Sequence, residues 1–363
     1  MAGNSNLNGA KTARKDEFYT RLSDIENELR HYRQHFRGKT VLCNCDDPFE
    51  SNFFKYFVLS FNKLGLKKLI ATCYAGSPIA YQQLSLLDSP GATEEVKNKP
   101  YKAVVTTVYD KTGDGGVDML DVAELFRSGE NELTELQGDG DFRSAECLEL
   151  LDEADIVVTN PPFSKFRDYL AVLMAHKKDF VIIGHQNAIK YREIFPLIMG
   201  NTIWLGYGFP GNVGFFESPY EDIAASSQHK EGMIRVSGVT WFTNLDIKKR
   251  HEEMILVRRY TPEKYPKYVN YDAIEVAKTS EIPCDYAGEM GVPITFMDKY
   301  NPDQFEIVGA SQHLIREISD DIRKKARYSQ IGCFYLDNHD GTYRKMYDRI
   351  VIRNKHPEPP KEG

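Results

Sequence analysis

Short apolar runs rich in β-branched residues alternate with helix-like segments over roughly the first 200 residues of the chain. The apolar runs lie at 40–45, 68–73, 103–109, 156–159, 180–184 and 202–205, and the helix-like segments at 16–36, 51–64 and 166–176. Strands that alternate with helices form mostly parallel sheets, because each crossover helix returns the chain to the same edge. We therefore predict an α/β fold with a doubly wound, mostly parallel, Rossmann-like sheet. Its ligand site should lie at the carboxyl ends of the strands.

The length and hydropathy of the chain predict a protein without a membrane-spanning helix. The 363 residues suffice for one large domain or two of ordinary size. No apolar run approaches the roughly 20 residues of a membrane helix. Residues 1–15 lack the apolar core of a secretory signal, and we expect them to be a disordered lead-in. These features predict a cytoplasmic protein without a membrane partner.

The cysteines and the charge pattern restrict the possible partners further. The six cysteines are scattered, with no CxxC pair and no Cys/His cluster, which favours reduced core cysteines and predicts no metal site. The net charge of −7 weighs against a phosphate-binding surface, since phosphate contacts need Lys and Arg. Basic residues nevertheless gather in the second half, at 248–250, 258–259, 323–327 and 344–355, where they can line a basic cleft.

The segment 155–163, Asp-Ile-Val-Val-Thr-Asn-Pro-Pro-Phe, carries the strongest chemical signal. Pro161 and Pro162 hold the loop stiff, since proline has a fixed φ and no N–H. The amide oxygen of Asn160 and the carbonyl of Pro161 can then accept both hydrogens of one amino group. An aryl amine held in this way presents its lone pair to a methyl sulfonium, and Phe163 supplies a ring on which a base can stack.

A proline-rich turn after a core strand is the structural alternative for this segment. The apolar strand before Asn160 and the aromatic residue after Pro162 favour the chemical interpretation. A DNA base reaches such a pocket only by leaving the helix.

Three weaker segments accompany this loop. Asp141 and Phe142, in Gly-Asp-Gly-Asp-Phe, suit an adenine ring, because a carboxylate accepts from its amine and an aromatic packs on its face. A glycine turn with solvated acids is the structural alternative for this segment. Residues 44–52 follow the first strand and contain either a helix cap at Ser51 or Asn52 or a carboxylate for a cofactor's amino group. Residues 16–20 open the first helix with acids that are ordinary dipole partners.

These segments, in this order, resemble those of the N6-adenine DNA methyltransferases, and closely those of the EcoRI-type modification methylases. The matching stretches are 16–20, 43–49, 51–57, 66–70, 138–144, 154–163, 243–246, 265–268, 270–274, 291–296 and 301–302. The resemblance thus covers nearly the whole chain. It implies S-adenosyl-L-methionine as the cofactor and a flipped adenine in double-stranded DNA as the substrate.

The resemblance also implies a role for each matching residue. The catalytic loop would be Asn160, Pro161, Pro162 and Phe163. The cofactor site would be lined by Phe18, Tyr19, Thr20, Asp46, Asp47, Pro48, Phe49, Asp141 and Phe142. Since the residue composition changes near residue 206, to a glycine-rich and then a polar stretch, we expect an S-adenosylmethionine-dependent catalytic domain at 16–206. Residues 207–363 would form a target-recognition region that returns to the catalytic body.

The resemblance further implies a bacterial or phage-encoded monomer that works beside a restriction endonuclease. The chain departs from the family pattern in two places. No acid ends the second strand at 71–74, where many methyltransferases bind the ribose, and 75–100 and 210–239 match poorly. A methyltransferase for RNA or a protein amide and a catalytically silent DNA-binding relative are the alternative functions.

Overall fold

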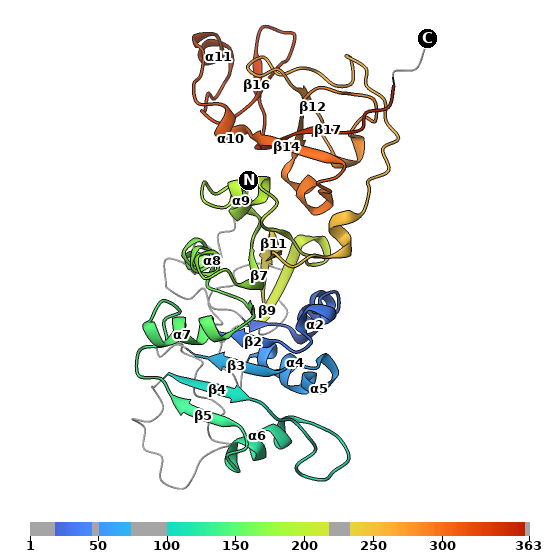
Figure 1. Cartoon of the computed structure of the whole chain (residues 1–363). Helices are drawn as coiled ribbons and strands as arrows, with labels where there is room; N and C mark the ends of the chain where they lie inside the picture. The colour runs from blue at the N-terminus through green and yellow to red at the C-terminus, as the bar shows by residue number, and fades with distance from the viewer. Residues whose placement is uncertain (1–18, 46–50, 74–99, 218–232, 360–363) are drawn as a thin grey trace. The chain divides into compact units, whose positions relative to one another are not determined.

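The chain forms two compact units, and Figure 1 labels many of their helices and strands. The computed structural model describes residues 19–45, 51–73, 100–217 and 233–359. The first unit comprises Met1–Ala188 and Trp204–Leu245, and the second comprises Ile189–Ile203 and Asp246–Gly363.

An eight-stranded sheet with the order β5-β4-β3-β2-β6-β7-β11-β8 forms the centre of the first unit. Its strands are β2 (Thr40–Cys43), β3 (Lys68–Thr72), β4 (Tyr101–Val105), β5 (Glu132–Glu135), β6 (Ile156–Thr159), β7 (Asp179–His185), β8 (Trp204–Leu205) and β11 (Val239–Thr243). The central strands β3, β2, β6 and β7 are mutually parallel, and β4 and β11 pair antiparallel with them on either side. Because β5 and β8 are antiparallel to those two strands, they run with the centre. The prediction of an α/β fold with a large, mostly parallel sheet is confirmed.

The central strands form where the sequence is continuously apolar. All four residues of β2 and all four of β6 are buried. Strands covered on both faces lose the alternation of apolar and polar residues that marks a half-exposed sheet. This explains why β6 has the bounds that the sequence predicted.

Helices connect the strands of the first unit, and three of those described begin at side-chain caps. They are α2 (Leu22–Leu29), α3 (Arg33–Phe36), α4 (Asn52–Leu59), α5 (Phe61–Leu64), α6 (Met119–Arg127), α7 (Ala145–Glu153) and α8 (Phe166–Ala175). Ser51 accepts from the N–H groups of Phe53 and Phe54 at the start of α4, and Ser144 accepts from Cys147 at the start of α7. Such caps satisfy N–H groups that the helix itself leaves unpaired. The cap at Ser51 fixes the start of α4, the next helix after β2 along the chain.

The expected helix at 16–36 begins later than the sequence predicted. Tyr19–Thr20 is a short strand, β1, that pairs antiparallel with β9 (Val213–Glu217), which in turn pairs with β10 (Met233–Ser237). The helical part is α2 and α3 only. Pairing with a strand almost 200 residues later is invisible in local periodicity, and it overrides the helical pattern here.

Other predicted element boundaries also differ from the observed ones. The predicted strand 103–109 is β4 at Tyr101–Val105, because Asn131 Oδ1 accepts from the N–H groups of Thr106 and Thr107 (3.0 and 3.2 Å) and replaces the next ladder bonds. Helices α6 and α7 and strand β5 were not predicted. Strand β11 lies beyond the expected boundary at residue 206, yet it pairs with β7 and β8, while Ile189–Ile203 belongs to the second unit. The compact units therefore divide the chain differently from the expected functional regions.

The second unit is built on a four-stranded sheet of order β12-β13-β17-β14. Its elements are α9 (Phe195–Met199), β12 (Ile274–Glu275), β13 (Met290–Pro293), β14 (Phe305–Ala310), α10 (Ser311–Leu314), α11 (Asp320–Lys325), β15 (Tyr335–Asp337), β16 (Tyr343–Lys345) and β17 (Arg349–Asn354). Beside the sheet, β15 and β16 form an antiparallel hairpin. A buried ion pair joins Glu275 of β12 to Arg349 of β17, and the Tyr268 hydroxyl donates to the same carboxylate.

Candidate active site at the carboxyl ends of β2 and β6

The carboxyl ends of β2 and β6 lie side by side in the middle of the sheet. Val41 pairs with Ile156 and Leu42 with Val157. The chain leaves β2 toward β3 on one side and later returns to β6 on the other. Such a reversal of strand order opens a crevice in which α/β proteins bind ligands. It brings Asn44 and Asn160, the residues that follow the two strands, to the same edge.

The Asn-Pro-Pro-Phe loop is well packed. Asn160 is 8% exposed and Phe163 7%, and Pro161 is also buried. Pro162, with φ −53° and ψ 127°, precedes the short 3₁₀ turn Phe163–Lys165, which leads into α8. The Asn160 side chain and the Pro161 carbonyl thus lie at the end of a buried strand, as the sequence placed them.

Asn44 is bound by Tyr169, a residue that the sequence analysis did not identify. The Tyr169 hydroxyl, on α8, donates to Asn44 Oδ1. Burial raises the pKa of Tyr169 well above its ordinary value, so the phenol stays protonated and remains a donor. Phe142 packs edge-on against the Tyr169 ring, with centroids 5.0 Å apart. Phe142, Tyr169 and Asn44 are thus connected by direct contacts, and Asn44 lies beside Asn160 at the ends of the paired strands β2 and β6.

Asp141 is held by its neighbours. Its backbone N–H donates to Asp139 Oδ1 (3.0 Å) across Gly140, whose φ of +76° favours glycine. The Arg143 guanidinium donates to both Asp141 oxygens, at 2.9 and 2.8 Å, and Lys165 Nζ lies 3.8 Å away. Hydrogen bonds from Arg143 lower the pKa of Asp141 to about 2. The carboxylate is therefore ionised at neutral pH, and its remaining lone pairs can still accept from a ligand amine.

The N-terminal strand reaches the start of α4. Asn52 Nδ2 donates to the carbonyl of Thr20 (2.8 Å), so Tyr19 and Thr20 lie beside the first turn of the helix that follows β2. The structure thereby brings Tyr19 and Thr20 toward the same region as Asn44. Phe18, Asp46, Asp47, Pro48 and Phe49, like the expected lead-in 1–15, lie outside the described residues.

Two buried threonine hydroxyls lie near this edge without a hydrogen-bond partner among the described residues. They are Thr20 Oγ1, in β1, and Thr72 Oγ1, at the carboxyl end of β3, and both residues are at most 2% exposed. A buried hydroxyl without a partner is costly, and a polar ligand can relieve that cost. Thr72 follows the residue that pairs with Cys43, where the sequence offered no acid.

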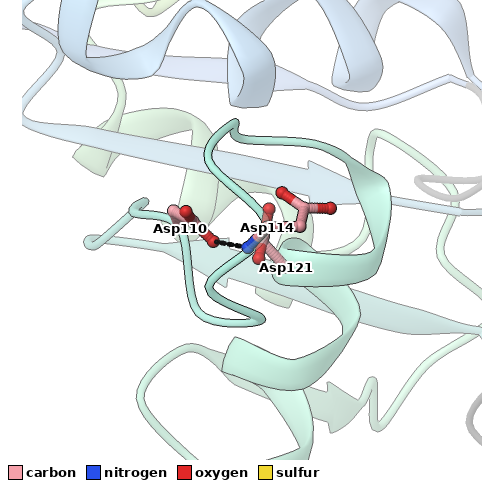
Figure 2. Close-up of side chains that lie close together, drawn as sticks. All are labelled: Asp110, Asp114 and Asp121. Carbon is pink, nitrogen blue, oxygen red and sulfur yellow. Dashed lines mark hydrogen bonds between the residues drawn. The ribbon is translucent and has the colours of Figure 1, made fainter.

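A cluster of three aspartates lies elsewhere in the first unit, as Figure 2 shows. Carboxylate oxygens of Asp110, Asp114 and Asp121 lie within 4.8 Å of one another. The buried Asp121 carboxylate accepts from the N–H groups of Lys111 and Thr112, each at 2.8 Å, and so ties the loop to α6. Because β4 is antiparallel to β3, the loop that follows it lies at the opposite edge of the sheet from Asn160. The cluster is not part of the candidate site.

No helix in the part of the chain that the structure describes has both the length and the apolar character to cross a membrane.

A mostly parallel α/β sheet with an Asn-Pro-Pro-Phe loop after its central strand β6 is the arrangement that the sequence predicted for a methyltransferase of planar amino groups. The family model of the adenine-specific methyltransferase EcoRI matches residues 6–355. The chain therefore belongs to the EcoRI family of adenine-specific methyltransferases.

Individual relatives agree with this family. The chain is 44% identical over 316 residues to the Type II methyltransferase M.EcoRI of Escherichia coli, covering 85% of this chain and 89% of that protein. It is 34% identical to the Type II methyltransferase M.MpnI of Mycoplasma pneumoniae and 36% identical to M.MgeORF184P of Mycoplasma genitalium, each over 96% of this chain and 98% of the relative. No solved structure matches the chain.

Proposed function

We propose that the chain is a site-specific DNA methyltransferase that transfers a methyl group from S-adenosylmethionine to the N6 amino group of adenine in duplex DNA. One observation carries the proposal: the Asn160 loop stands at the carboxyl end of β6, next to Asn44 at the end of β2. Membership of an adenine-specific family and the names of the relatives support it. The order of β3, β2 and β6 supports a Rossmann-like, doubly wound arrangement.

Asn160 and Pro161 bind the amino group in this proposal. The amide oxygen of Asn160 and the carbonyl of Pro161 accept its two hydrogens. This holds the nitrogen with its lone pair directed away from the ring plane, where it can act as a nucleophile. Since both residues are buried, water competes little for these hydrogen bonds, and they act more strongly than in solution.

The cofactor site fits the polar atoms at the neighbouring strand ends. S-adenosylmethionine, when bound, supplies an electrophilic methyl group on a sulfonium. Asp141 would accept from its adenine amine, and Phe142 would pack on its adenine ring. Thr20 and Thr72 each offer a buried hydroxyl without a described partner. The roles of Tyr19, of Phe18 and of 46–49 remain predictions from the family resemblance.

Phe163 has a smaller role than its sequence position suggests. At 7% exposure most of its ring packs against the protein, and a flipped adenine would contact only the uncovered edge. Flipping costs a few kcal/mol of stacking and pairing, which the pocket must offset. In this proposal, the hydrogen bonds of Asn160 and Pro161 therefore carry more of the base's binding energy than the Phe163 ring.

The remaining assignments concern the partners. Residues 207–363 supply target recognition in this proposal, and much of that range belongs to the second unit. The Type II relatives suggest that a restriction endonuclease of the same specificity accompanies the enzyme. We propose that the enzyme acts as a monomer.

Transfer of labelled methyl groups tests the proposal directly. The purified chain is incubated with labelled S-adenosylmethionine and, separately, with genomic duplex DNA, total RNA and a protein extract. We expect incorporation into DNA alone, recovered as N6-methyladenine in one sequence context. Labelling of RNA or protein instead of DNA would favour the alternative substrates. Cofactor binding without any transfer would indicate a silent DNA-binding relative.

Replacing Asp141 with alanine should weaken S-adenosylmethionine binding by about 1–3 kcal/mol, because a buried donor of the ligand loses its acceptor. Isothermal calorimetry measures the change. Since the Asp141 pKa is lowered to about 2, its carboxylate stays charged above that value. Asp141 should therefore cause no pH dependence of cofactor affinity between pH 5 and 9. Asp168→Ala, at an exposed acid 4.0 Å from Arg143, is the control and should bind normally. Unchanged affinity in Asp141→Ala would place the adenine site elsewhere.

A further inference from the structure

The second unit exposes a basic strip, which we define as residues 323–331 together with Arg344. It begins in α11, whose cap Ser319 accepts from the N–H of Ile322. Ile322 is buried against Cys333 and Tyr335 and anchors the helix. After α11 the chain runs beside β16, with a bridge between Ala326 and Tyr343. The strip is therefore a surface of defined shape.

Three cations of the strip form no ion pair with a described carboxylate. Arg323 pairs with Asp320 (4.0 Å) and Lys325 with Asp321 (2.9 Å), and Lys345, the neighbour of Arg344, donates to Gln330 (3.0 Å). By contrast, Lys324, Arg327 and Arg344 are exposed, and no described carboxylate lies within ion-pair distance of them. On a chain with net charge −7, such unpaired cations create a local positive field.

Apolar side chains are exposed among these cations. Tyr328 is 66% exposed and Ile331 57%, and Tyr347, three residues after Arg344, is 67% exposed. The Arg327 guanidinium lies over the Tyr328 ring, 5.4 Å from its centroid. Exposed aromatics interleaved with unpaired cations are unusual on a surface that contacts only water. They suit a polyanion that offers both phosphates and apolar sugar surface.

We propose that the basic strip binds the sugar-phosphate backbone of duplex DNA. The inference rests on the proposed function, because it assigns a surface to that substrate. Lys324, Arg327 and Arg344 would each neutralise a phosphate, and the Tyr328 hydroxyl would donate to another. Duplex DNA carries one charge per roughly 1.7 Å of axis, so several cations of one strip can be engaged together. Contacts of this kind position the protein and carry no sequence information.

The test compares two charge-matched variants of the full chain. In the first, Lys324→Gln, Arg327→Gln and Arg344→Gln remove three cations of the strip. In the second, Lys264→Gln, Lys278→Gln and Lys299→Gln remove three exposed cations elsewhere in the same unit, outside the basic groups at 248–250 and 258–259. Binding to a labelled duplex is measured by fluorescence anisotropy at salt concentrations from about 50 to 200 mM, the range over which phosphate contacts dominate.

We expect the strip variant to lower the slope of log affinity against log salt by about 2.7, which is roughly 0.9 for each of three lost phosphate contacts. Its affinity should fall at least about tenfold, and equally for duplexes of different sequence. The second variant should keep the wild-type slope. Restoring charge with Arg327→Lys in place of Arg327→Gln should recover part of the slope.

The possible failures can be told apart. Cofactor affinity and the unfolding midpoint should match the wild type in both variants. If the triple change unfolds the chain, Arg344→Gln alone should lower the slope of log affinity against log salt by about 0.9. A wild-type protein that methylates DNA, with a strip variant of unchanged slope, overturns this inference but not the proposed function. The same holds if both variants lose the same slope. A wild type that does not act on DNA overturns both.

Discussion

Replacing Asn160 with alanine is expected to slow methyl transfer by at least about 10²-fold, the scale of removing one preorganised polar group at a reacting centre. The side chain is 8% exposed at the end of β6 and, in the proposed site, accepts one hydrogen of the target amine. Without it the amine keeps its lone pair in the ring and is a poor nucleophile. Single-turnover transfer to a duplex with a known target measures the loss, and calorimetry should show S-adenosylmethionine affinity nearly unchanged.

Asn131→Ala is the matched control for this experiment. Asn131 is also buried, at 4% exposure, but it bonds the backbone at Thr106 and Thr107, at the opposite edge of the sheet. Its loss should reduce stability and leave the transfer rate of the folded enzyme intact. If Asn160→Ala turns over at a near-normal rate, or if both variants slow equally, Asn160 does not bind the reacting amine.

Replacing Glu275 with alanine is expected to destabilise the second unit by about 3–5 kcal/mol, because a buried charge then loses its partner. Arg349 donates to Glu275 through Nε and Nη2, at 3.0 and 2.6 Å, and both side chains are under 10% exposed. The variant leaves the guanidinium buried opposite an apolar methyl. Amide hydrogen exchange of β13 and β17 measures the loss directly in that unit.

Two internal comparisons make this result interpretable. Both tryptophans, Trp204 and Trp241, belong to the first unit, so urea unfolding followed by their fluorescence should shift little. Glu306→Ala breaks a half-exposed pair with Arg353 and should cost at most about 1 kcal/mol. An equally small loss of stability in Glu275→Ala would mean that water reaches the Arg349 guanidinium and replaces the lost carboxylate.

Local sequence patterns were sufficient where an element is made by its own residues. Strand β6 has its predicted bounds, since an apolar run buried on both faces can form little else between a helix and a Pro-Pro turn. Helix α8 was predicted to within a residue at its end. Elements made by distant partners were missed or shifted. Tyr19–Thr20 reads as the first turn of a helix but pairs with β9, and β4 ends early because Asn131 takes over its hydrogen bonds.

The candidate site divides in the same way. The Asn160 loop stood out in the sequence because its chemistry is carried by consecutive residues, whereas Asp141 and Phe142 were assigned to the proposed cofactor site through the family resemblance. Tyr169 and Thr72 were not identified, since a tyrosine on an apolar helix and a threonine ending a strand are ordinary core residues. The one sign that could have indicated Thr72 was the lack of an acid at that strand end, which left the position to another polar group.

By itself, the sequence determined the family, the α/β class, and the Asn-Pro-Pro-Phe loop together with the apolar strand that precedes it. These depend on residues that are neighbours along the chain. Only the tertiary structure decided that Asn44 lies beside Asn160 and that the Tyr169 hydroxyl donates to Asn44. It also decided that the Arg143 guanidinium donates to the Asp141 carboxylate. The buried ion pair between Glu275 and Arg349 is a third such result. The physical reason is the same in each case. Strand order and side-chain pairing depend on packing between segments far apart along the chain, and hydrophobic periodicity records that a residue is buried but not what buries it.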